Sequence, residues 1–127
     1  MKPDLFEFYL GSFRGTSCYA KWTGTSLRFE RTGGGNFTGS VSELFPSGGA
    51  WQRFRRDLEE NGCFSWSEEY LAPHGCCGTT FWFLRIVIDG KHVETRGTGC
   101  FPPDGDPDPS AEFRAFLTAF SRLVAGS

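Results

Sequence analysis

Residues that could bind a metal or act as nucleophiles lie close together near the middle of the sequence. His74, Cys76 and Cys77 belong to one His-Gly-Cys-Cys segment, and Cys63 lies upstream of it. Imidazole and thiolate groups are ligands that zinc prefers, so these residues define an alternative hypothesis of a thiol-dependent or zinc-dependent protein. Structural zinc sites usually use cysteine pairs separated by two residues, and this sequence has none. A nucleophilic thiolate would also need an orienting group, so we expect no metal, no cofactor and no enzymatic activity.

Two further segments imitate known sites and then depart from them. The three glycines at 33–35 suggest a phosphate-binding loop, but the Gly-Lys-Ser/Thr ending of such a loop is missing. Asp104, Asp106 and Asp108 alternate as in the first half of a calcium loop, but Pro109 stands where an EF-hand needs glycine. We therefore expect neither nucleotide nor calcium binding.

A cluster of arginines suggests contact with phosphates. Arg53, Arg55 and Arg56 fall on one expected helix, and guanidinium groups beside exposed rings can bind single-stranded nucleic acid. Asp57 and Glu59 follow within the same helix and can pair with these arginines. The net charge of -2 and the isoelectric point near 5.7 also disfavour a nucleic-acid partner, so this hypothesis is the weaker alternative.

The first part of the chain has the pattern of strands. Apolar and polar residues alternate over 5–10, 18–22 and 27–30, which predicts a three-stranded antiparallel meander. The segment 32–49 is rich in glycine and is expected to be a flexible loop, with a short strand at 36–41 as its only regular structure.

The second part has the pattern of two helices around a hairpin. Apolar residues at helical spacing predict a helix from Ala50 to a cap at Gly62. Strands at 80–88 and 91–97 are joined by Asp-Gly, a dipeptide that favours a two-residue hairpin turn. A last helix is expected to begin at an Asp108 cap. The fold class is therefore α+β, with an antiparallel sheet of about five strands and two helices packed on one face.

The composition is that of one globular domain covering residues 1–127. The chain is 39% hydrophobic and 22% charged, and its 14 Phe, 4 Trp and 3 Tyr predict a core built largely from aromatic rings. No apolar run reaches the roughly 18 residues that a membrane helix needs, and no secretory leader pattern is evident. We therefore expect no membrane association and a location in the bacterial cytoplasm, where cysteines stay reduced.

Structural motifs along most of the chain resemble those of a loose group of small uncharacterised bacterial proteins. The motifs are the Gly-Ser-Phe-x-Gly turn at 11–15, a helix ending before Trp66, the Asp-Gly hairpin, and Gly97 followed by Phe-Pro at 101–102 before the last helix. These residues are structural glycines, prolines and rings. The resemblance therefore implies no activity, cofactor or catalytic residue.

The sequence is best interpreted as a non-enzymatic protein-protein binding or accessory module, such as an immunity protein, an inhibitor or a subunit of a complex. Tryptophan, tyrosine and arginine are the residue types that dominate interface hot spots. The candidate contact residues are Trp51, Arg53, Arg55, Trp66 and Tyr70. Trp66 and Tyr70 are expected either to cover the edge of the core or to form part of the interface.

Overall fold

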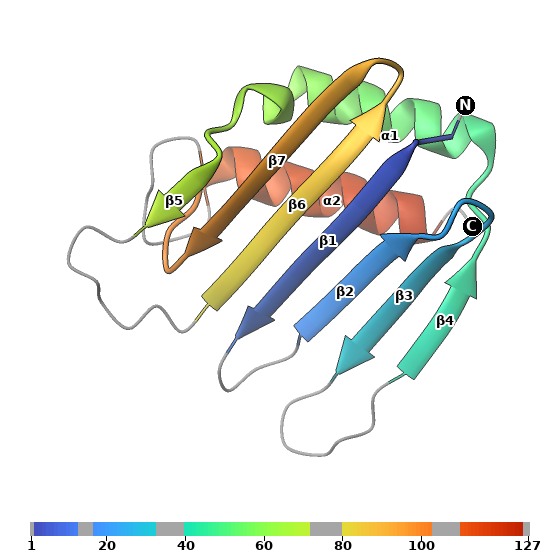
Figure 1. The fold of residues 1–127 in the computed structure, drawn as a ribbon, viewed down its shortest axis with the longest axis horizontal. Helices are drawn as coiled ribbons and strands as arrows, with labels where there is room; N and C mark the ends of the chain where they lie inside the picture. The colour runs from blue at the N-terminus through green and yellow to red at the C-terminus, as the bar shows by residue number, and fades with distance from the viewer. Residues whose placement is uncertain (1, 13–16, 33–39, 72–79, 103–109, 126–127) are drawn as a thin grey trace.

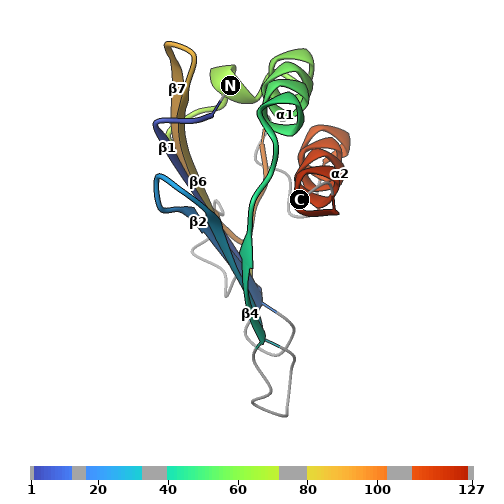
Figure 2. The ribbon, with the colours of Figure 1, turned by 90° about the vertical axis from the view of Figure 1, so that its right-hand side faces the viewer.

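The fold is one mixed β-sheet with two helices on one of its faces. The computed structural model describes residues 2–12, 17–32, 40–71, 80–102 and 110–125. Its sheet has seven strands in the order β4-β3-β2-β1-β6-β7-β5 (Figure 1). Figure 2 shows the sheet edge-on, with both helices on the same side. The strands are β1 (Leu5–Ser12), β2 (Ser17–Trp22), β3 (Leu27–Thr32), β4 (Ser40–Leu44), β5 (Glu69–Leu71), β6 (Thr80–Ile88) and β7 (Lys91–Thr98).

The predicted meander and the predicted hairpin are both confirmed, and the pairing of β1 with β6 joins them into one sheet. β1, β2 and β3 pair antiparallel in succession, and β6 pairs antiparallel with both β1 and β7. At the hairpin, Asp89 has φ 51° and Gly90 has φ 75°. Two positive φ values are what a type I′ turn requires, so the Asp-Gly dipeptide fixes the β6–β7 register.

Three parts of the expected sheet need correction. The sheet has seven strands rather than about five, and it is not purely antiparallel, because the short strand β5 pairs parallel with β7. Within the described residues, the fourth strand, expected at 36–41, spans Ser40–Leu44 and so extends further along the chain, and it pairs with β3. The segment 32–49, expected to be a loop, thus contains β4 and the first residues of a helix, while its residues 33–39 lie outside the described part of the chain.

Both helices begin at a serine that caps the first turn. Helix α1 spans Gly48–Glu60, and the Ser47 side chain accepts a hydrogen bond from the Ala50 N–H at 3.1 Å. Helix α2 spans Ala111–Ala125, and Ser110 Oγ accepts from the Phe113 N–H at 3.1 Å. The expected cap of α2 at Asp108 lies outside the described residues, and the structure assigns this role to Ser110. None of the described helices is long and apolar enough to cross a membrane.

The space between the sheet and the helices is filled with aromatic rings, as the composition predicts. Phe6 from β1 packs edge-on against Trp51 and Phe54 of α1, with ring centroids 5.7 and 5.5 Å apart. Phe8 packs against Phe116 of α2 at 4.9 Å. Because both helices cover this face of the sheet, the alternate residues of the same strands lie on the opposite face, which we call the open face.

Candidate functional site

The open face carries an aromatic cluster on its two central neighbouring strands. The cluster consists of Tyr9 on β1 and Phe81 and Phe83 on β6. Tyr9 and Phe83 are cross-strand partners whose rings stack at 5.9 Å, and Phe81 lies 6.0 Å from Tyr9 and 6.2 Å from Phe83. Phe81 is 41% exposed, so the cluster presents apolar surface to solvent.

Gly11 allows the Tyr9 ring to lie flat along β1. A Cβ atom at Gly11 would lie 2.6 Å from Cζ of Tyr9, which is closer than real Cβ contacts allow. The ring therefore occupies the surface that a side chain at position 11 would otherwise fill. Phe81, the cross-strand partner of Gly11, borders the same surface and extends the cluster along β6.

Ion pairs surround the aromatic cluster. Arg85 Nη1 lies 3.3 Å from Glu7 Oε1, and Arg85 Nε lies 3.9 Å from Glu94 Oε1. Arg96 Nη2 lies 2.8 Å from Glu69 Oε2, which ties β7 to the edge strand β5. Exposed pairs of this kind contribute little stability, typically about 0 to 1 kcal/mol, so their main effect is to place charges of both signs around the rings.

Tyr19 connects the charged groups to the neighbouring strand. Its hydroxyl donates a hydrogen bond to the Glu7 carboxylate, which also accepts from Arg85. Partial burial, this hydrogen bond and the nearby negative charges of Glu7 and Glu30 raise the pKa of Tyr19 to about 12. Tyr19 therefore remains a neutral donor at physiological pH and holds Glu7 in place.

A hollow of about 230 Å³ lies beside the aromatic cluster on the open face. Its lining combines rings with charged side chains, including Phe81, Phe83, Glu7, Glu68, Arg85, Glu94 and Arg96. The structure has a larger hollow of about 420 Å³ between α2 and strands β1–β3. Arg31 is the one charged residue among those that line it, so the larger hollow offers fewer groups that could select a ligand.

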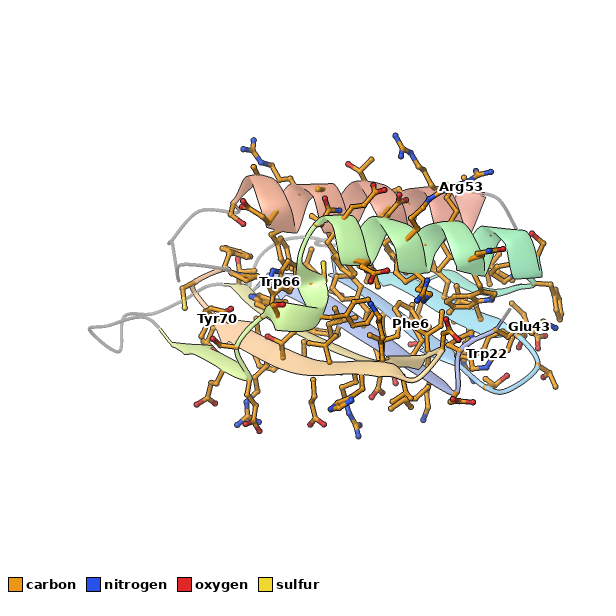
Figure 3. The ribbon with its side chains drawn as sticks, turned by 90° about the horizontal axis from the view of Figure 1, so that it is seen from above. Phe6, Trp22, Glu43, Arg53, Trp66 and Tyr70 are labelled. Carbon is orange, nitrogen blue, oxygen red and sulfur yellow. The ribbon has the colours of Figure 1, made fainter. Side chains whose placement is uncertain are left out.

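The three aromatic residues predicted to contact a partner lie in the core. Trp51 is 0% exposed, Trp66 is 7% exposed and Tyr70 is 8% exposed. Figure 3 shows Trp66 and Tyr70 between the sheet and the helices. Of the two expected alternatives for Trp66 and Tyr70, the structure supports covering the core, and the surface of the folded chain offers none of the three rings to a partner.

The two predicted arginines differ in their surroundings. Arg55 pairs with Asp89 at the hairpin turn at 3.2 Å and with Glu59 at 3.8 Å, so it links α1 to β6 and β7. Arg53 is exposed on the outer side of α1, as Figure 3 shows, and it borders a hollow between the two helices. Arg53 and Arg55 therefore lie on the helical side of the molecule, away from the open face. Nucleic-acid binding through this helix stays a prediction.

The zinc hypothesis falls largely on residues that the structure does not describe. Cys63 is fully buried, and burial raises the pKa of its thiol to about 12, which opposes formation of a thiolate. His74, Cys76 and Cys77 lie outside the described residues. Within the described ranges, no group of three or more His, Cys, Asp or Glu is arranged to hold a metal ion. Metal binding at these four positions stays a prediction.

The sequence interpretation overlooked the open face as a candidate site. The alternation over 80–88 places Phe81, Phe83 and Arg85 on the side of β6 opposite to its buried residues. A signal was available, because Glu7 and Tyr9 alternate with the buried residues of β1 in the same way. Glu7 on β1 and Arg85 on β6 both belong to the residues that alternate with the buried ones. Charged residues at such positions on two neighbouring strands indicate a sheet face that solvent reaches.

The comparisons with known proteins leave the site to be interpreted from its geometry. No protein-family model matches the chain, and no curated protein is significantly similar to it. The resemblance to small bacterial proteins therefore stays a prediction and carries no functional assignment.

Proposed function

We propose that the protein is a non-enzymatic binding module that contacts another protein through the open face of its sheet. The observation that carries this proposal is the exposed aromatic cluster of Tyr9, Phe81 and Phe83 with ion pairs around it. Protein interfaces typically have an apolar centre with a polar rim, and aromatic residues and arginine are enriched in them. The cluster and its charged surroundings have this arrangement.

The charges that line the hollow favour a protein over a nucleic acid as the binding partner. Its lining includes Glu7, Glu68 and Glu94 but only two arginines, and both arginines already pair with carboxylates. Phosphate groups would meet more negative than positive charge there, whereas nucleic-acid binding gains most of its affinity from neutralising phosphates. Arg85 and Arg96 are both held in ion pairs with carboxylates, which suits contact with a protein surface better than proton transfer.

The proposal includes a biological class. A small domain with one prepared face fits an immunity protein, an inhibitor or a subunit of a larger complex. We propose the bacterial cytoplasm as its location, where free thiols such as those of Cys18, Cys63 and Cys100 stay reduced.

Native mass spectrometry of the tagged protein, purified from its own host, tests the proposal. We expect a stoichiometric protein partner that is lost with Phe81→Ser. Phe45→Ser is the matched control, because Phe45 is 63% exposed and follows the distant edge strand β4, outside the strands that form the open face. The partner should remain with this control. A partner that both variants retain equally, or the absence of any partner, would contradict the proposal.

A further inference from the structure

The hollow on the open face carries an excess of negative charge. The acidic residues that line it are Glu7, Glu68 and Glu94, and the basic residues are Arg85 and Arg96; Glu69 adjoins the hollow through its ion pair with Arg96. Three carboxylates against two guanidinium groups leave one negative charge among the lining residues, and the adjoining Glu69 adds a second. Lys21, the next cation along the sheet, lies on β2 beyond Glu7 and is not among the residues that line the hollow.

The excess charge is concentrated on the β7 and β5 side of the hollow. Glu94 is 70% exposed and its shortest ion-pair distance, to Arg85, is 3.9 Å. Arg96 lies much closer to Glu69, at 2.8 Å. Glu68 is exposed and forms no ion pair within the described residues. Glu68 and Glu94 are therefore the two carboxylates that are best placed to accept hydrogen bonds from a new cation.

The opposite side of the hollow is aromatic. Phe81 and Phe83 line it, with their centroids 6.2 Å apart. A cation over a ring face is attracted to the ring, and the alkyl stem of a long basic side chain is stabilised by contact with apolar surface. Rings and carboxylates in one hollow are complementary to a side chain that has an apolar stem and a cationic end.

We infer that this hollow binds an arginine side chain presented by the partner protein, with its stem on Phe81 and Phe83 and its guanidinium group directed toward Glu68 and Glu94. The inference rests on the proposed function, since it names the chemistry of the partner at the same site. Arginine fits better than lysine because its planar group both stacks on rings and forms paired hydrogen bonds with carboxylates. The volume of about 230 Å³ lies below the roughly 300 to 1,000 Å³ of small-molecule pockets and suits one side chain.

The probe for the experiment is N-acetyl-arginine amide, titrated into the isotope-labelled protein and followed by NMR. We expect saturable shifts of the backbone amides of Phe83, Arg85 and Glu94, with a dissociation constant in the millimolar range that corresponds to about 4 kcal/mol. N-acetyl-glutamine amide, which has no charge, should cause no saturable shift. Equal shifts from both compounds, or no shift from the arginine compound, would overturn the inference.

Paired variants separate a specific site from the general attraction of an acidic protein. Glu68→Gln with Glu94→Gln should weaken binding of the probe by about two- to thirtyfold, which corresponds to about 0.2 to 1 kcal/mol for each of the two exposed pairs. Glu60→Gln with Glu112→Gln removes the same charge from exposed positions on the two helices and should leave binding unchanged. Equal weakening by both pairs would refute a specific site.

The two proposals fail in different ways. A host partner that is lost with Phe81→Ser, together with no binding of the arginine probe, would refute the inference and leave the proposed function intact. Binding of the probe without any host partner would support the arginine site and contradict the proposed function. Binding of a single-stranded oligonucleotide in place of the arginine probe would overturn both.

Discussion

Replacing Gly97 with alanine should destabilise the strand pair that carries the proposed site. Gly97 is the cross-strand partner of Trp82, whose fully buried indole lies over it and donates a hydrogen bond to the Cys100 carbonyl at 3.0 Å. A Cβ at position 97 would lie 2.6 Å from that carbonyl oxygen and would also overlap the indole nitrogen. The indole and the backbone at Cys100 cannot both stay where they are.

The expected cost of Gly97→Ala follows from two effects. Overpacking of a core typically costs about 1 to 3 kcal/mol. If the indole moves away from Cys100, a buried N–H loses its partner, which costs about 1 to 3 kcal/mol more. The sum of about 2 to 6 kcal/mol is a large part of the roughly 5 to 15 kcal/mol by which a domain is stable. Urea unfolding followed by circular dichroism measures this free energy directly.

Gly49→Ala is the matched control for this substitution. Gly49 lies in the first turn of α1, where the nearest contact of a new Cβ would be Ser47 Oγ at an ordinary 3.8 Å. Alanine also has a higher helix propensity than glycine, so this variant should be as stable as the wild type or more stable by up to about 1 kcal/mol. A free energy of unfolding for Gly97→Ala within about 1 kcal/mol of the wild type would refute the argument.

A double variant identifies the indole as the obstacle. Trp82→Phe removes the indole nitrogen, and in the Gly97→Ala background it should cost about 1 kcal/mol less than it does alone, or even restore stability. Additive effects of the two substitutions would show instead that the clash with the Cys100 backbone dominates.

Three further predictions concern single side chains. The pKa of Tyr19 is about 12 in the folded protein against an ordinary value of 10.0, so the folded state holds this proton more tightly, and stability should fall as the pH rises from about 10 to 12. Tyr19→Phe should remove this part of the pH dependence of urea unfolding, and an unchanged dependence would contradict it. Ser47→Ala should lower the free energy of unfolding by about 1 kcal/mol through loss of the α1 cap, whereas a loss below about 0.3 kcal/mol would show that the cap is dispensable. Cys63, fully buried and with a pKa of about 12, should react with iodoacetamide more slowly than the half-buried Cys18, as peptide mapping of the native protein can show, and the reverse order would contradict the burial.

Local patterns in the sequence were sufficient to predict most elements of the fold. The alternation in β1, β2 and β3 and the Asp-Gly turn between β6 and β7 are properties of neighbouring residues, and the structure confirms them. The apolar spacing likewise predicted helix α1, although Trp51, which was also chosen as a contact candidate, lies in the core with Phe54 and Leu58.

The strands that the sequence did not predict depend on contacts between residues that are distant in sequence. Strand β5 has three residues, too few to show alternation, and it exists because Glu69 to Leu71 pair with β7. The position of β4 is likewise set by its pairing with β3, which includes Leu27 opposite Leu44. A periodicity argument cannot detect such strands, because the stabilising hydrogen bonds come from another segment.

The choice of contact residues from the sequence was limited in a similar way, because it rested on residue type alone. Trp66 and Tyr70 were chosen for their residue types, which are common both in interfaces and in cores. The structure places both against Trp82, with ring centroids 6.2 Å apart in each case. Residue type alone cannot distinguish these two environments, whereas the side of the sheet on which a ring lies can.

The contrast between Trp82 and its neighbours on β6 explains why the open face is the better candidate. Trp82 is fully buried beneath the helices, while Phe81 and Phe83 point to the side that neither helix covers. A sheet face that only solvent covers needs no aromatic rings for stability. On such a face, polar residues are expected at every second position of each strand. Rings at these positions, with Tyr9 stacked on Phe83 and carboxylates around them, are the arrangement on which the proposed partner contact rests.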